Sequence, residues 1–181
     1  FVAFAKANPG KVNFASTGTG NLSHLAGELF KMMAGVDLVH IPYRGAPGAH
    51  TGLMNGDVQM MFDTMSSALP HIRSGRLRAL AVTTATRWER MPDLPTVGES
   101  IPGYAMSGWL GLGAPKRTPT AIIEKLNKEL NAVLANPDIK SRFSDLGLNV
   151  LGGTPADFGK LMVGDTEKWA KVVRMAGIKP E

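Results

Sequence analysis

VNFASTGTGNLSHLAGELFKMMAGVDLVHIP, residues 12–42, contains a strand, a loop, a helix and a second strand in succession. Residues 12–15 form a short apolar run that predicts a buried strand, and residues 16–21 read as a glycine-rich loop. Apolar residues then recur at helical spacing until Gly35, a typical helix stop. Residues 37–41 predict the next strand. This strand–helix–strand unit is typical of a parallel sheet.

The same alternation continues after residue 42. A helix is expected to open at Pro47, because proline is tolerated at the first helical position. Residues 58–62 predict a third strand and residues 77–84 a fourth, and Pro70 disturbs a short helix between them. The pattern therefore predicts an α/β fold with a mainly parallel sheet.

The second half of the chain has a different sequence pattern. An irregular proline-containing stretch, residues 87–103, is followed by a long extended segment. The elements expected after it are helices over 119–134 and 137–146, a strand near 148–151, and a last amphipathic helix from Thr154-Pro155 to about 176. We therefore predict two units, residues 1–103 and residues 104–181. The second has too little strand for a sheet of its own, so we expect it to complete a domain begun by residues outside this chain.

Composition narrows the possible functions. The chain of 181 residues is 44% hydrophobic and 19% charged, which is typical of a globular protein. It has no cysteine, which excludes disulfides, thiolate catalysis and thiolate zinc sites. The net charge is +5, but the densest basic stretch is interrupted by Glu89 and Asp93, so we do not expect nucleic-acid binding. That stretch comprises Arg73, Arg76, Arg78, Arg87 and Arg90.

The first residue is Phe1, and no basic segment followed by an apolar run marks a secretory signal near it. We therefore expect sequence upstream of this chain, and any export signal with it. No apolar run approaches the roughly 20 residues that span a bilayer.

Three loops follow a strand and precede a helix: residues 16–21, 42–48 and 62–66. In a parallel sheet such loops meet at the carboxyl edge, where open α/β folds bind ligands. In the first loop, Gly18 and Gly20 allow a close backbone approach. Hydroxyl groups come from Ser16, Thr17, Thr19 and Ser23.

The start of the following helix would add N–H groups and the positive end of a dipole, which favours an anion. Alternatively, Thr19, Asn21 or Ser23 only caps the helix and the glycines only make a turn. Both interpretations stay open at this point. The loop lacks the Lys-Ser/Thr of a P-loop, and Ser23 replaces the third glycine of a dinucleotide fingerprint.

The other two loops offer charged side chains. Arg44, between Tyr43 and Gly45, can pair with a carboxylate or lie solvated on the surface. Asp63, between Phe62 and Thr64, can hydrogen-bond a water or an ammonium group, or cap the next helix.

Nothing in the sequence predicts a metal site, a cofactor or catalysis. The histidines are His24, His40, His50 and His71, and they form no HxH or HExxH pair. We expect His24 to bond the neighbouring loop backbone and His40 to have a satisfied structural role. No G-x-S-x-G motif and no close carboxylate pair supports an enzyme.

The loops and strands together resemble the Bug family of solute-binding proteins, also called TctC, of tripartite tricarboxylate transporters. The matching stretches are residues 5–83, LPTVGES (94–100), WLGLGAPKRTP (109–119) and KWAKVVRMAGIKPE (168–181). The resemblance implies a periplasmic-binding-protein-like (type II) fold with two domains that close on a ligand. Residues 1–103 would be the second domain, nearly complete, and residues 104–181 a crossing strand plus the carboxyl-terminal part of the first domain.

The resemblance also implies a ligand-binding wall. Residues 16–25 match the family pattern Ser-x-Gly-x-Gly-x-x-x-His-Leu, and would contact a carboxylate chiefly through Ser16, Thr17, Gly18 and Ser23. Thr19, Gly20 and His24 would belong to the same ligand-binding site. The 43–45 and 62–64 loops would extend the same wall, with Arg44 where many relatives carry lysine.

The implied role is a periplasmic receptor that passes a di- or tricarboxylate, an amino acid or an aromatic acid to membrane permease subunits, without catalysis. The alternatives are an α/β enzyme acting on small carboxylic acids and a ligand-sensing module for a membrane partner. Relatives have about 100 further amino-terminal residues that supply the opposite wall. We therefore expect the chain alone to present a half-site with little affinity, and apolar helix faces that favour a homodimer or partial disorder.

Overall fold

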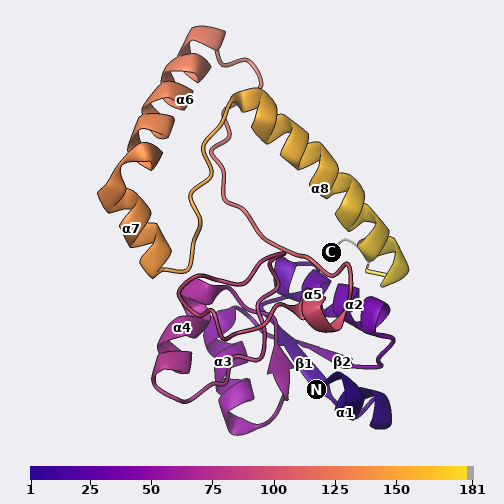
Figure 1. The fold of residues 1–181 in the computed structure, drawn as a ribbon. Coiled ribbons are helices and arrows are strands. Elements are labelled where there is room, and N and C mark those ends of the chain that lie inside the picture. The colour runs from indigo at the N-terminus through magenta and orange to yellow at the C-terminus, as the bar shows by residue number, and fades with distance from the viewer. Residues whose placement is uncertain (179–181) are drawn as a thin grey trace. The chain divides into compact units, whose positions relative to one another are not determined.

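The computed structural model describes residues 1–178, and its amino-terminal part is an alternation of helices and parallel strands (Figure 1). The elements of this part are α1 (Val2–Ala7), β1 (Asn13–Ser16), α2 (Leu22–Ala34), β2 (Val39–Pro42), α3 (Ala46–Asn55), β3 (Met60–Met61), α4 (Met65–Arg73) and α5 (Val97–Ser100). Three helices follow them: α6 (Thr120–Ala135), α7 (Pro137–Asp145) and α8 (Pro155–Met175).

The sheet has the strand order β2-β1-β3, and both pairs of neighbours are parallel. Ala15 pairs with Ile41 of β2 and with Met61 of β3, so β1 is the central strand. The predicted α/β class with a parallel sheet is therefore confirmed.

Helices α2 and α3 cover opposite faces of this sheet. The side chain of Phe14 touches Gly27 of α2, whereas Ala15 packs with Ala49 of α3. Because consecutive strand residues point to opposite faces, the two helices must lie on opposite sides of β1. The chain therefore leaves the neighbouring strands β1 and β2 toward different faces, as at the ligand-binding edge of open α/β sheets.

Two predicted strands are wrong. In the predicted strand 77–84, Val82 forms a single parallel bridge to Thr96, and Leu80 is 52% exposed. The predicted strand 148–151 is not a strand either, and Leu151 is 70% exposed. Both segments are apolar enough, but a strand also needs a partner whose backbone groups pair with its own.

The structure also contains a short helix, α5, inside the stretch expected to be irregular. Thr96 Oγ1 accepts a hydrogen bond from the Glu99 N–H, and the Glu99 carboxylate accepts one from the Thr96 N–H. Threonine followed three residues later by glutamate is the sequence signature of this capping box, so the helix was predictable.

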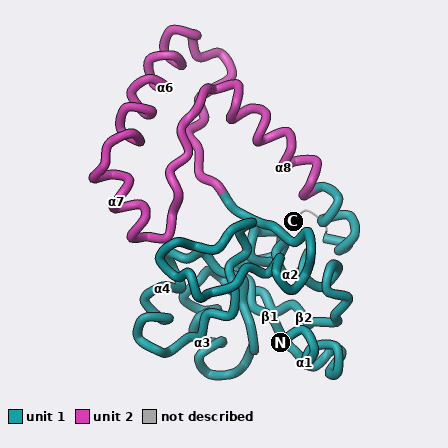
Figure 2. The backbone as a smooth tube through the Cα atoms, viewed as in Figure 1, with its two compact units in different colours: residues 1–108, 170–181 teal, residues 109–169 magenta. Residues whose placement is uncertain are grey.

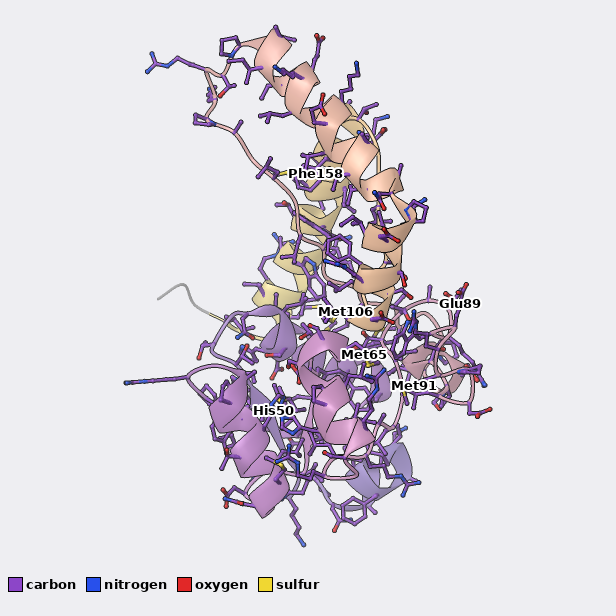
Figure 3. All side chains as sticks on the ribbon, turned by 90° about the vertical axis from the view of Figure 1, so that its left-hand side faces the viewer. His50, Met65, Glu89, Met91, Met106 and Phe158 are labelled. Atoms are coloured by element: carbon purple, nitrogen blue, oxygen red, sulfur yellow. The ribbon has the colours of Figure 1, made fainter. Side chains whose placement is uncertain are left out.

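The chain divides into two compact units (Figure 2). Unit 1 comprises residues 1–108 and 170–181, and unit 2 comprises residues 109–169. In unit 2 the Trp109 ring lies edge-on to Phe158, which Figure 3 labels, with 5.0 Å between centroids. No residue of α6 or α7 is buried. Within residues 1–178, no helix is both long and apolar enough to cross a membrane.

Gly27 provides a test of the packing on β1. In Gly27→Ala the new methyl group would overlap the ring of Phe14, a side chain that is fully buried. We expect a loss of about 1–3 kcal/mol in the free energy of unfolding, as in other overpacked cores. Urea denaturation followed by circular dichroism measures it.

The matched control is Gly48→Ala in α3, where the added carbon meets Tyr43 at an ordinary 3.5 Å. This substitution should change the stability by less than about 1 kcal/mol. Equal effects of the two substitutions would contradict the tight contact between α2 and β1.

Candidate functional site

The three predicted loops follow the carboxyl ends of β1, β2 and β3, and we call them the first (16–21), second (42–48) and third (62–66) loop. The first two are joined directly, because the Tyr43 N–H donates to the Ser16 carbonyl at 3.0 Å. The Gly45 N–H likewise donates to the Thr17 carbonyl at 3.2 Å. The parallel pairing of β1 and β2 thus continues from the sheet into these two loops.

The first loop turns at two glycines and ends in a helix cap. Gly18 has φ +146° and Gly20 has φ +75°, conformations that strain residues with a side chain. Asn21 is the N-cap of α2, and its Oδ1 accepts from the His24 N–H at 3.2 Å. The capping interpretation is therefore correct for Asn21. It does not compete with anion binding, because the N–H groups of Leu22 and Ser23 at the start of the helix still lack intrahelical partners.

Side-chain hydroxyls hold the first loop together from inside. Ser23 Oγ accepts from the Thr17 N–H at 2.9 Å and donates to Asn21 Oδ1 at 2.7 Å. The Asn21 amide in turn donates to Thr17 Oγ1. Ser16 is fully buried, and its hydroxyl donates to the Gly18 carbonyl and accepts from the Gly18 N–H. These bonds fix the loop before any ligand arrives.

Two stacked imidazole rings lie beneath the first loop. The rings of His24 and His40 are 3.7 Å apart between centroids and 8° from parallel. The Gly20 N–H donates to His24 Nδ1 at 3.0 Å, and His40 Nε2 lies 2.6 Å from Ser16 Oγ. The predicted bond from His24 to the loop backbone and the satisfied role of His40 are both confirmed.

Both rings are held in their neutral form. Burial, together with the neighbouring His24 and Lys31, lowers the pKa of His40 to about 4. Burial also lowers the pKa of His24, opposed by Glu28, whose Oε1 lies 3.7 Å from His24 Nε2, and reinforced by Lys31. At neutral pH the pair therefore adds no net charge below the loop.

The second loop combines an anchor with an exposed cation. The Tyr43 ring packs against Gly48 and Gly52 of α3, so Tyr43 joins the loop to its helix. Arg44 is exposed, and no hydrogen bond or ion pair within residues 1–178 engages its guanidinium group. Gly45 has φ +91° and is the N-cap of α3.

In the third loop the Asp63 carboxylate is already occupied. Its Oδ2 lies 2.6 Å from Nε2 of His50, which is on α3 (Figure 3). Its Oδ1 accepts from the Thr64 N–H at 2.8 Å and from Ser67 Oγ at 2.8 Å. The side chain of Asp63 is only 12% exposed. Asp63 therefore holds the start of α4 and connects the third loop to α3.

Phe62 and Thr64, on either side of Asp63, have other contacts. The Phe62 ring packs against Phe30 and Tyr104, with centroid distances of 5.6 and 6.3 Å. Thr64 is the N-cap of α4, although its hydroxyl caps no helical N–H and accepts only from Ser66 Oγ at 3.3 Å. Thr19 belongs to the turn between the two glycines.

His40, His50 and Ser67 were not among the predicted site residues. Each of them supports a predicted loop residue. Ser67 is four positions after Asp63, whereas His40 and His50 are far in sequence from the residues that they support, Ser16 and Asp63. The strand alternation gave one usable signal, because Phe14 and Ser16 share a face and His40 pairs with Phe14 in the sheet. Within the described residues, no group of three or more histidines and carboxylates is suited to a metal ion.

Comparison with known proteins supplies the context for these loops. Residues 1–178 match the family described as tripartite tricarboxylate transporter family receptor, TctC. A UPF0065 protein from the tcbD-tcbE intergenic region of Pseudomonas sp. strain P51 is 40% identical over 171 residues, 93% of this chain. This chain spans 51% of that protein, about half the length of a curated relative.

Two solved structures show the same fold over a longer chain. Rpa4515 of R. palustris, solved with adipate, superposes with a TM-score of 0.91 at 34% identity over 99% of this chain. MatC of Rhodopseudomonas palustris, solved with malate, superposes with a TM-score of 0.83 at 30% identity over 96% of this chain. In both comparisons this chain covers 60% of the solved chain.

The contact between His50 and Asp63 can be tested by a double-mutant cycle. His50→Leu and Asp63→Asn should each destabilise unit 1, but the double variant should lose less than the sum. We expect a coupling energy of about 1–3 kcal/mol, because the pair is in direct contact and mostly covered. Urea denaturation of the four proteins measures it.

Thr51 provides the control cycle. It is also on α3, but its hydroxyl bonds only to the Pro47 carbonyl of the same helix. Thr51→Ala should therefore be additive with Asp63→Asn within about 0.5 kcal/mol. A coupling energy near zero for His50 and Asp63 would show that the third loop is not held by α3.

Proposed function

Because the chain belongs to the family of tripartite tricarboxylate transporter receptors, we propose that its three loops form one wall of a binding site for a small dicarboxylate in a periplasmic solute receptor. The observation that carries this proposal is the first loop, which is fixed from inside and ends at the N-terminus of α2. The enzyme alternative raised by the sequence is not supported, since the matching family is one of receptors.

The chemistry of the wall suits a carboxylate. The first N–H groups of α2 point out of the helix at the positive end of its dipole, which favours negative charge. In the first loop the hydroxyls of Ser16, Thr17 and Ser23 bond to the loop itself. Because the Thr17 and Gly18 N–H groups already donate to Ser23 Oγ and Ser16 Oγ, we assign the direct contacts chiefly to the N–H groups at the start of α2, and to the hydroxyls a second, supporting contact.

The charges of the wall agree with this assignment. Arg44 is an exposed cation on the loop that is bonded to the first loop. The carboxylate of Asp63, which would repel an anion if it were free, is covered by His50, Thr64 and Ser67. The wall therefore offers an available positive charge, while its own carboxylate already accepts hydrogen bonds within the protein.

The ligand class follows from the relatives. Rpa4515 was solved with adipate and MatC with malate, and both ligands are dicarboxylates. A molecule with two separated carboxylates can place one against the first loop and the other elsewhere. We assign residues 1–103 to one domain of such a receptor and residues 104–181 to the crossing segment and part of the other domain. Membrane permease subunits are the proposed recipients of the ligand.

The 181 residues alone should bind adipate or malate weakly. They span about half the length of a curated relative, and a ligand held by one wall keeps much of its surface in water, unlike ligands of ordinary pockets. Isothermal titration calorimetry of the chain with both acids should give no affinity tighter than about millimolar, or about 4 kcal/mol. Micromolar binding would refute the half-site, although it would leave carboxylate binding intact.

Arg44 should matter once both walls are present. In a chimera that joins these residues to the amino-terminal half of the Pseudomonas relative, Arg44→Gln should weaken adipate binding about 10–100-fold, because a hydrogen bond to a charged group contributes about 1.5–3 kcal/mol. Arg78→Gln removes the same charge from an exposed position outside the three loops. Equal losses for both variants would show that Arg44 acts only through net charge.

A further inference from the structure

His24 accepts a hydrogen bond that only one of its protonation states can accept. The Gly20 N–H donates to His24 Nδ1 at 3.0 Å. A backbone N–H can only donate, so Nδ1 must carry a lone pair. The neutral ring therefore has its proton on Nε2, which lies 3.7 Å from Glu28 Oε1. A second proton on this ring can only go to Nδ1.

The bond acts on the part of the first loop that has the least other support. It fixes the peptide group between Thr19 and Gly20, immediately before the N-cap Asn21. Gly20 has φ +75°, and nothing lies within 4 Å of the place where its Cβ would be. The hydroxyl bonds described above hold residues 16–18 and 21–23. Among residues 1–178, His24 alone bonds to the turn between them.

We propose that His24 is a positioning residue for the anion-binding loop, and that protonation of its Nδ1 releases the Thr19–Gly20 peptide and weakens carboxylate binding. This role rests on the proposed function, since it concerns the same site. Protonation replaces an acceptor by a donor, so that two N–H groups then face each other across 3.0 Å. The Gly20 N–H must turn away, and the loop loses the conformation that presents its donors.

The groups that face His24 come from each element packed against it. On α2 itself, Glu28 favours the proton and Lys31 opposes it, and Lys31 Nζ lies 3.0 Å from the same Glu28 oxygen. On β2 the stacked His40 opposes a charge on the adjacent ring. On β1 the neighbour is Phe14, which carries no charge.

The sign of the pH effect follows from these neighbours. Burial lowers the pKa of His24 below its ordinary 6.5, so the ordered loop favours the unprotonated ring. The ordered loop is therefore complete at neutral pH and is lost as the pH falls below 6.5 through the lowered pKa of His24. If His24 instead contacted the ligand directly as an imidazolium, acidification would strengthen binding of an anion. The two roles thus predict opposite signs.

The first experiment needs no ligand. In the ¹⁵N-labelled 181-residue chain, we expect the Gly20 amide to be protected from exchange at neutral pH and to lose protection as the pH falls below 6.5 and His24 takes up a proton. His24→Asn places a carbonyl oxygen near the position of Nδ1 and cannot titrate, so its Gly20 amide should stay protected throughout. His24→Leu removes the acceptor and should leave the amide exposed at every pH. If the protection of the Gly20 amide from exchange does not change as His24 titrates, the proposal is wrong.

The second experiment measures binding in the two-walled chimera. Adipate affinity is compared between wild type and His24→Asn at the same pH, so that protonation of adipate cancels in the ratio. We expect near-equal affinities at neutral pH and a roughly tenfold weaker wild type at about one pH unit below the pKa of His24. His71→Asn, a substitution outside the three loops, should keep the wild-type pH dependence. A wild type that gains affinity over His24→Asn in acid would also overturn the proposal.

The two experiments separate the proposal from the function on which it rests. If adipate and malate bind neither wild type nor variants while the Gly20 amide follows His24, the proposed function fails and the loop chemistry stands. If they bind and the amide does not follow His24, the function stands and the positioning role fails.

Discussion

The parallel pairing of β1 with β2 is the interaction on which the candidate site depends. It places Ser16 opposite Pro42, and two further hydrogen bonds extend it into the loops, from the Tyr43 N–H to Ser16 and from the Gly45 N–H to Thr17. The same register stacks His40 against His24, because both rings lie on the face of the sheet that carries Phe14 and Ser16. Without this pairing, the first and second loops would have no fixed relation.

A wall that binds anions must keep some hydrogen-bond donors available to the ligand, so these donors must not bond to acceptors of the protein itself. In the first loop, Ser16 Oγ and Ser23 Oγ each accept a backbone N–H and fix the loop, which leaves the N–H groups at the start of α2 as the donors for a ligand. Donors that are already fixed lose little conformational freedom when a ligand arrives, so more of their interaction energy remains as affinity. The neutral His24 and His40 rings support the loop at neutral pH without adding a charge that would attract a competing anion into the interior.

The sequence predicted the elements of the site better than the contacts within it. Glycines, an Asn before an apolar run and a strand–loop–helix order are local signals, so the first loop and the cap at Asn21 could be anticipated. His50 lies 13 residues before Asp63, and only the fold brings them together. The strands expected at 77–84 and 148–151 failed for the same reason, since apolar spacing describes a segment and says nothing of a partner for its backbone. The capping box of Thr96 and Glu99 was a local signal that was overlooked.

The two units differ in how completely their residues are buried and hydrogen-bonded within the unit. In unit 1, Phe14, Ala15 and Ser16 are fully buried, and every hydrogen bond described for the first loop joins residues of this unit. In unit 2, α6 leaves Ile122 50% and Val133 52% exposed, and none of its residues is buried. An apolar helix face of this kind is ordinarily covered. The order of the first loop therefore does not depend on covering unit 2, so the wall that we propose for a carboxylate can be complete, donors and supporting histidines included, within unit 1.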